Sequence, residues 1–189
     1  MSDSAFPSRE DALALLREWI QNPNLLKHCY AVEAAMRHYA RELGGDEERW
    51  AVTGLVHDFD WERHPDAVRH PLEGVKVLRE RGWPEDICRA VLGHASYTGV
   101  PRDTPMARVL YACDELCGFL VACALVTPHK TLDEVEVAGV RKKMKRADFA
   151  RNVNREDIVN GAAELGVDLG QHIAATLEAM RGIKGELGL

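Results

Sequence analysis

The sequence predicts an all-α fold, a single-domain helical bundle that spans residues 1–189. Apolar residues recur at helical spacing in nearly every segment, and no stretch alternates apolar and polar residues as a half-buried strand does. The chain has 189 residues, of which 46% are hydrophobic. That length suffices to bury one core and fits one domain better than two.

The N-terminal part of the chain predicts three helices. Ser8 and Asp11 resemble a capping box that starts the first helix. Asn24 is expected to cap the second helix, which ends at Gly44, and Asp46 starts the third. The second helix carries an apolar stripe that we expect to face inward: Leu25, Cys29, Val32, Met36, Tyr39 and Leu43.

Prolines mark the starts of the next three helices. Pro71, Pro84 and Pro105 each stand where a first helical turn would begin, a position at which the missing N–H costs nothing. The helix from Pro105 to about residue 126 is apolar on almost every face, which predicts a central, buried helix. Two later helices follow, one capped by Asn154 and one that begins at Asp168.

Composition excludes several function classes. A formal charge of -6 argues against general binding to nucleic acids or membrane surfaces, although a local basic patch remains compatible with it. No apolar run is long enough to span a bilayer, and residues 1–10 lack the layout of a secretion signal. We therefore expect a cytoplasmic protein that acts neither on membranes nor on nucleic acids.

The cysteine pattern indicates neither disulfides nor a thiolate zinc site. The five cysteines form no C-x-x-C pair, and their number is odd. We expect most of them to be small core residues. The set comprises Cys29, Cys88, Cys113, Cys117 and Cys123.

Four polar residues fall on predicted inward faces of three helices. His28 lies on the stripe of the second helix, His57-Asp58 ends the apolar third helix, and Asp114 sits in the central helix. A buried carboxylate costs several kcal/mol unless it is paired or metal-bound. A buried His–Asp hydrogen-bond network would satisfy these charges, but four such residues favour a metal, with nitrogen and oxygen ligands suited to Mn, Fe, Co, Ni, Zn or Mg.

The ordered set H…HD…D resembles the HD superfamily of metal-dependent phosphohydrolases. The resemblance covers about residues 24–126, and it implies a helical bundle with the metal site at its centre, on which helices between 131 and 185 would pack. The stretches "HPLEGV" from His70 and "VLGHASYTG" around His94 are similar to the intermediate histidine motifs of the HDIG-type subgroup. The chain departs from that subgroup at two places. It has Phe59-Asp60 where the subgroup has Ile-Gly, and it has Ala95 where some members have a second histidine.

The resemblance implies hydrolysis of a phosphate ester, with a nucleotide or another small phosphorylated metabolite as substrate and one or two divalent ions per chain. It assigns His28, His57, Asp58 and Asp114 to one metal. A second metal would bind His70 and His94, with Asp58 as the bridging carboxylate. The competing interpretation makes His70 a helix cap and His94 a direct phosphate contact, and the two interpretations carry equal weight.

Asp58 and one further carboxylate are the expected catalytic residues. Asp60, Glu62 and His64 follow the metal motif, and any of them could serve as general acid or base beside the metal. Charged residues just past a helix end are more often solvated. Asp60 is the first choice.

The densest basic run of this acidic chain is "VRKKMKR", which contains Lys142, Lys143 and Lys145. These lysines are expected to bind substrate phosphate, and a solvated helix face is an equally good interpretation.

Functions of other classes stay open. An HD-like fold can bind a nucleotide or a partner as a regulatory module without turnover, although such a module would not need all four inward residues. A structural helical adaptor leaves Asp114 unexplained, and metal-dependent oxygenation would require a di-iron site.

Overall fold

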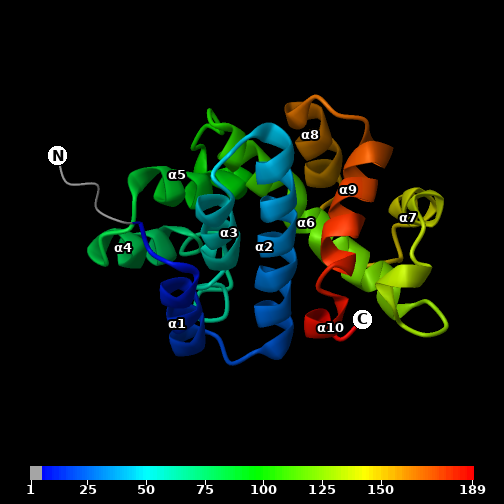
Figure 1. The fold of residues 1–189 in the computed structure, drawn as a ribbon, viewed down its shortest axis with the longest axis horizontal. Coiled ribbons are helices and arrows are strands. Elements are labelled where there is room, and N and C mark those ends of the chain that lie inside the picture. The colour runs from blue at the N-terminus through cyan, green and yellow to red at the C-terminus, as the bar shows by residue number, and fades with distance from the viewer. Residues whose placement is uncertain (1–5) are drawn as a thin grey trace.

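The computed structural model describes residues 6–189, and this part of the chain contains helices and no strands (Figure 1). The all-α prediction is therefore confirmed. The helices are α1 (Arg9–Trp19), α2 (Pro23–Leu43), α3 (Glu47–Val56), α4 (Leu72–Glu80), α5 (Glu85–His94), α6 (Pro105–Leu125), α7 (Val137–Met144), α8 (Arg155–Leu165), α9 (Leu169–Arg181) and α10 (Lys184–Leu187). Two short 3₁₀ turns lie at Ser96–Thr98 and Leu132–Glu134.

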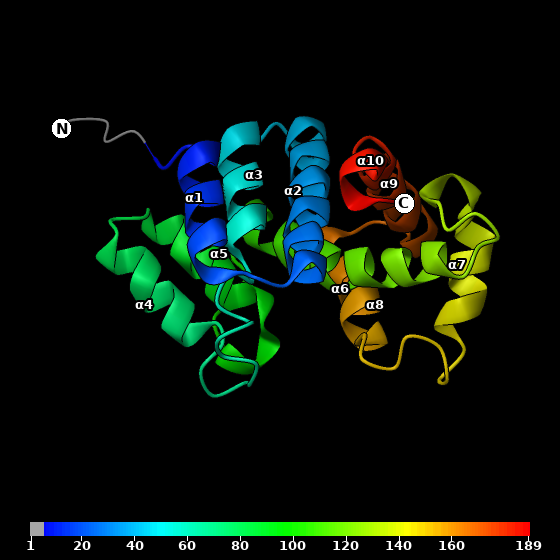
Figure 2. The same cartoon turned by 90° about the horizontal axis from the view of Figure 1, so that it is seen from below.

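The bundle is organised around α2 and α6. Helix α2 packs against α3, α6 and α9, and α6 also contacts α5 and α8. Figure 2 shows α1, α3 and α2 side by side, with α6 passing α2 and running toward α7. Helices α4 and α5 lie at one end of the molecule and α7 at the other (Figures 1 and 2).

The helix starts follow local hydrogen bonding. The predicted capping box is confirmed, because the Asp11 N–H donates to Ser8 Oγ at 3.2 Å and the Ser8 N–H donates to Asp11 Oδ2 at 2.8 Å. Helix α2 begins two residues earlier than predicted: its cap is Asn22, whose Oδ1 accepts from the Asn24 N–H. Pro23 is compatible with the first helical position, where no N–H is needed.

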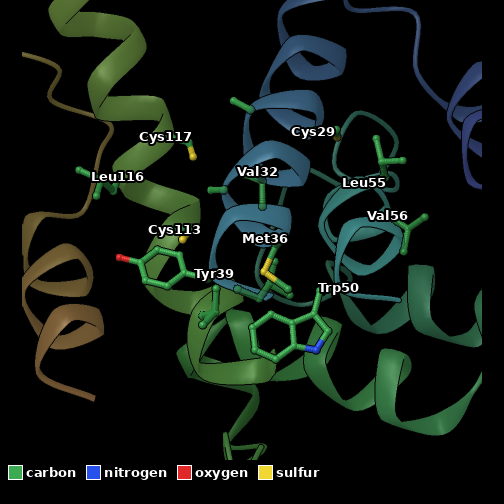
Figure 3. Packing of buried hydrophobic residues seen from close by; sticks show 14 of the residues in the cluster. Cys29, Val32, Met36, Tyr39, Trp50, Leu55, Val56, Cys113, Leu116 and Cys117 are labelled. Carbon is green, nitrogen blue, oxygen red and sulfur yellow. The ribbon is translucent and has the colours of Figure 1, made fainter. Parts of the chain in front are cut away.

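The helix from Pro105 is the central, buried helix that its composition predicts. Its residues Leu110, Leu116 and Leu120 are fully buried, and so is most of the inward stripe of α2 (Figure 3). All five cysteines are buried and free, as expected of small core residues. Leu43 corrects the predicted stripe: it lies in the last turn of α2, just before Gly44, and is 54% exposed.

No helix within residues 6–189 combines the length and apolar character that crossing a bilayer requires. Residues 1–5, which include half of the segment considered for a secretion signal, lie outside the described part of the chain.

Candidate metal centre

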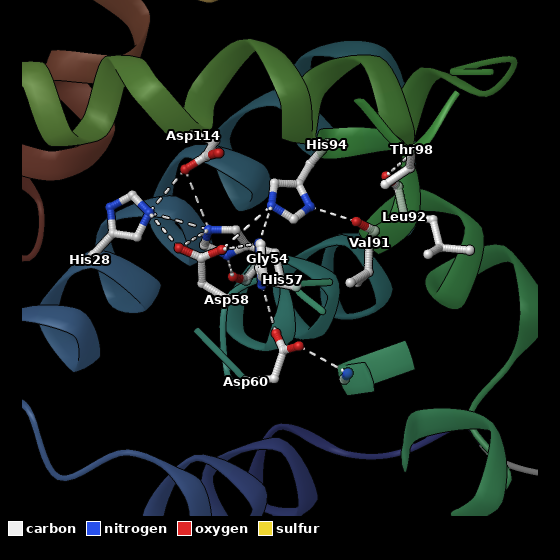
Figure 4. Close-up of polar contacts among 12 residues, drawn as sticks. His28, Gly54, His57, Asp58, Asp60, Val91, Leu92, His94, Thr98 and Asp114 are labelled. Carbon is white, nitrogen blue, oxygen red and sulfur yellow. Dashed lines mark hydrogen bonds and ion pairs between the residues drawn. The ribbon is translucent and has the colours of Figure 1, made fainter. Parts of the chain in front are cut away.

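The packing of α2, α3 and α6 brings four predicted ligands together. His28 projects from α2, Asp114 from α6, and His57 and Asp58 from the C-terminal end of α3 (Figure 4). His28 Nε2 lies 3.2 Å from His57 Nε2 and 3.0 Å from Asp114 Oδ1. Asp58 Oδ2 lies 3.5 Å from His57 Nε2. One candidate ligand atom from each residue falls within 4.8 Å of the others, so the four form a first cluster.

A second cluster lies on the other side of Asp58. Asp58 Oδ1 is 3.3 Å from His70 Nε2 and 3.4 Å from His94 Nε2. The two imidazole Nε2 atoms are themselves 3.3 Å apart. The two oxygens of one carboxylate therefore face two different groups of histidines. This arrangement is compatible with the bridging role that the resemblance implies.

Hydrogen bonds on the far side of the rings fix which nitrogen faces each cluster. The Nδ1–H of His57 donates to the Gly54 carbonyl at 2.7 Å, and that of His94 donates to the Val91 carbonyl. The Nδ1–H of His70 donates to Asp60 Oδ1 at 2.8 Å. When these rings are neutral, each Nε2 carries a lone pair and no proton.

The converging Nε2 atoms fit a metal ion better than they fit a hydrogen-bond network. Two neutral imidazoles with lone pairs 3.3 Å apart, as in His70 and His94, cannot hydrogen-bond to each other. A cation between the two Nε2 atoms would satisfy both lone pairs. Metal-binding histidines usually donate their other ring N–H to a carboxylate or a carbonyl, as His70 does to Asp60. The donor set of imidazoles and carboxylates suits a divalent transition metal.

The charges of the site keep its carboxyl groups ionised. When no metal is bound and the imidazoles are protonated, burial raises the pKa of Asp58, but the charge of His57 and a hydrogen bond from His94 outweigh burial and hold this pKa well below its usual range. In the same state burial also opposes ionisation of Asp114, and hydrogen bonds from His28 and His57 reverse the effect, so its pKa is strongly lowered. Both residues are therefore in the form that binds a cation.

A cavity of about 550 Å³ opens onto both clusters. Sequence reasoning missed most of its other walls. Glu115 follows Asp114 on α6, accepts the Asn154 N–H at 3.1 Å, and has a pKa raised to about 7, first by burial and then by the charge of Asp114. The remaining missed residues include Trp61, Tyr97, Tyr111, Asn154 and Asp157. Glu115 and Gly118, which also lines the cavity, lie within one helical turn of Asp114 on α6. This spacing was the one signal in the sequence that could have placed Glu115 in the wall.

Asp60 lies behind the second cluster and does not line the cavity. It is fully buried, and its two oxygens accept hydrogen bonds from His70 Nδ1 and from the Gly74 N–H at 2.9 Å. Glu62 accepts the N–H groups of Gln21 and Asn22.

His64 also lies away from the cavity, with its ring 6.4 Å from that of Trp19. The cavity lining therefore includes none of Asp60, Glu62 and His64. None of the three is positioned there as a proton donor.

The basic run is not brought to the site. Lys142, Lys143 and Lys145 lie on or just after α7, at the end of the molecule opposite α4 and α5 (Figure 1). None of them lines the cavity.

Comparison with known proteins agrees with the geometry. The HD domain family model matches residues 25–118. Ribonuclease Y of Oleidesulfovibrio alaskensis is 32% identical to this chain over 101 residues, which is 50% of this chain and 18% of that protein's length. No solved structure matches significantly.

The matched range includes every residue of both clusters. The chain belongs to the HD superfamily, whose domains are in general metal-dependent hydrolases.

Proposed function

We propose that this protein is a phosphohydrolase that binds two divalent metal ions and cleaves the phosphate ester of a small metabolite. The main support is the position of Asp58, whose two oxygens separate the histidines into two clusters. Two metals held a few ångströms apart clamp the attacking and leaving oxygens of a displacement, and bound metal lowers the pKa of the attacking water.

The geometry supports a set of ligand roles. In the proposal, His28, His57 and Asp114 would hold one ion, His70 and His94 would hold the other, and Asp58 would contribute to both. Asp60 acts as a positioning residue, because both of its oxygens are occupied and one of them orients His70. This proposal replaces the proton-transfer role expected from the sequence.

A small substrate suits the charges better than a polymer does. The relative is named a ribonuclease, but the chain matches 18% of that protein. The net charge of -6 and the cavity walls, which include neither lysine nor arginine among the described residues, give a polyanionic strand little to bind. A nucleotide or another small phosphorylated metabolite needs only the metal cluster for its phosphate.

A non-catalytic regulatory module is the second candidate. It would bind a nucleotide in the same cavity without turnover. The presence of both ligand sets counts against it, because binding alone does not need two histidine groups that share one carboxylate.

The test combines metal analysis with a substrate panel. Purified protein, loaded in turn with Mn, Fe, Co, Ni, Zn or Mg, is assayed against phosphomonoesters, cyclic and linear phosphodiesters and an RNA oligonucleotide. We expect hydrolysis of at least one small ester, and its loss in Asp58→Ala. The matched control is His129→Ala, because His129 is an exposed histidine paired with Glu134 and does not line the cavity.

The outcomes separate the candidates. Binding of a nucleotide without hydrolysis under any metal would favour the regulatory module. Equal hydrolysis by the parent and Asp58→Ala would overturn the assigned site.

A further inference from the structure

The cavity walls carry negative charge and no fixed positive charge. Within residues 6–189, four carboxylates line the cavity, from Asp58, Asp114, Glu115 and Asp157, and no lysine or arginine does. Phosphate-binding sites that take di- or triphosphates ordinarily oppose the additional charge with basic side chains or helix N-termini. Here the N-terminus of α8 reaches the wall at Asn154, but the acidic residues of its first turn, Glu156 and Asp157, offset its dipole, so the metal cluster would be the main opposing charge.

Arg69, next to His70, pairs with Asp66, and two other arginines near the walls are also engaged. Arg102 stacks on the Tyr111 ring, but its guanidinium binds Glu164 at 2.6 and 2.8 Å and the Gly93 carbonyl. Arg155 follows Asn154 and donates to the backbone carbonyls of Ala150 and Val153. Neither lines the cavity, so neither supplies a phosphate contact there.

The wall beside the second cluster is aromatic. The Trp61 ring lies edge-on to His70, with centroids 4.9 Å apart, and is 40% exposed. Tyr97 is 54% exposed and donates its hydroxyl to the His70 carbonyl at 3.0 Å, which fixes the ring at the cavity edge. Exposed aromatic rings at a cavity wall offer apolar faces on which a planar group can stack.

The wall beside the first cluster accepts hydrogen bonds. Asp157 receives the Tyr111 hydroxyl and the Asn154 side-chain amide, each at 2.7 Å, and these bonds hold its carboxylate at the cavity. Glu115 lies next to it in the same wall. Carboxylates at such a position suit hydroxyl or amino donors in the uncharged part of a ligand.

We infer that the cavity selects a nucleoside monophosphate, that is, an ester with a single phosphoryl group whose leaving group carries a planar base and sugar hydroxyls. The inference deepens the proposed function and rests on it for the position of the phosphate. The metal cluster takes the phosphoryl group, the Trp61 and Tyr97 wall takes the base, and the carboxylate wall takes sugar hydroxyls. A second or third phosphate would meet carboxylates and no lysine or arginine of the cavity lining, and the repulsion from the carboxylates is weakly screened inside a cavity.

Hydrolysis of a matched series measures the phosphate count. The metal-loaded protein is given AMP, ADP, ATP and ribose 5-phosphate at one buffered free-metal concentration. We expect kcat/KM to fall at least tenfold from AMP to ADP and again for ATP. We also expect it to fall at least tenfold for ribose 5-phosphate, which lacks the base. Equal kcat/KM for AMP and ATP, or for AMP and ribose 5-phosphate, would overturn the inference while leaving the phosphohydrolase proposal intact.

Binding gives a second measurement that does not depend on turnover. Calorimetry on metal-loaded protein should show AMP binding at least tenfold tighter than ATP. Trp61→Ala should weaken AMP binding more than Trp61→Phe, and it should leave the affinity for inorganic phosphate unchanged. Trp83→Phe is the matched control, because Trp83 is buried and lies outside this cavity.

The two proposals fail in different ways. AMP binding that depends on Trp61, without hydrolysis of any ester, would contradict the phosphohydrolase proposal and support the inferred ligand class. AMP affinity unchanged in Trp61→Ala would remove the base-binding wall.

Discussion

The two metal-binding clusters share Asp58 but are built by different means. In the first cluster, His28 and Asp114 belong to the interiors of α2 and α6, two helices fixed by the hydrophobic core. In the second, His70 and His94 lie at the ends of elements, and hydrogen bonds to Asp60 and to the Val91 carbonyl orient their rings. Core packing therefore places His28 and Asp114, whereas polar contacts orient His70 and His94.

The clusters also differ in access. In the first cluster His57 is fully buried, but the side chains of His28 and Asp114 are 20% and 19% exposed, while both histidines of the second cluster, His70 and His94, are nearly enclosed, at 3% and 4%. Enclosure alone therefore does not fix a ring, because those of His70 and His94 depend on single hydrogen bonds for their orientation. We expect the enclosed cluster to be the more easily disturbed, because removing one polar contact can turn a ring.

The largest expected effect comes from the residue common to both clusters. Asp58→Ala should lose both metal ions and all measurable ester hydrolysis, since the bridging ligand is removed together with one negative charge. Helical circular dichroism should persist, because the change removes no core volume. Elemental analysis of the purified variant measures the metal. Retention of both ions would show that Asp58 bridges nothing.

A smaller effect, confined to the second cluster, is expected for Asp60→Asn. The amide cannot accept from both His70 and Gly74 as the carboxylate does. We expect the second ion to bind about 10 to 100-fold more weakly and the first to be unaffected. Metal titration by calorimetry distinguishes the two ions. A parallel loss of both would mean that the clusters are not independently held.

Gly74→Ala is expected to disturb the second cluster through Asp60. A Cβ at this position would lie 2.6 Å from Asp60 Cγ, so the added methyl group must displace the carboxylate or α4. We expect a loss of stability of about 1–3 kcal/mol and a weaker second ion. Gly139→Ala, in α7, is the matched control, since its Cβ would meet only Lys143 Nζ at 4.0 Å. Urea unfolding and metal titration give the two readouts, and an unchanged second ion would remove Asp60 as the positioning contact.

The smallest effect is expected outside both clusters. Replacing Lys142, Lys143 and Lys145 together by Gln should leave KM and kcat unchanged at low salt, because none of them lines the cavity. Steady-state kinetics at low and high salt test this. A raised KM with strong salt dependence would instead support the phosphate-binding role predicted from the sequence.

Local patterns were sufficient to predict most of the helices. The Ser8–Asp11 capping box, the stop at Gly44 and the apolar helix from Pro105 depend on residues within a few positions of one another, and the structure confirms all three. The predicted cap of α2, Asn24, was wrong by two residues. Both Asn22 and Asn24 can cap a helix, and only the backbone shows that Asn22 does so.

The residues of α2 and α6 that face inward can be predicted without a structure, and so can the possibility that His28 and Asp114 meet His57-Asp58. Helical periodicity is a property of consecutive residues, so it can be read without knowing the partners of a helix. Three other features become visible only in the folded chain: Asp60 lies behind His70, the α7 lysines lie away from the cavity, and Trp61 and Glu115 form part of its walls. Those positions depend on how separate helices pack and on where an irregular segment finds its hydrogen bonds, and no local pattern encodes either.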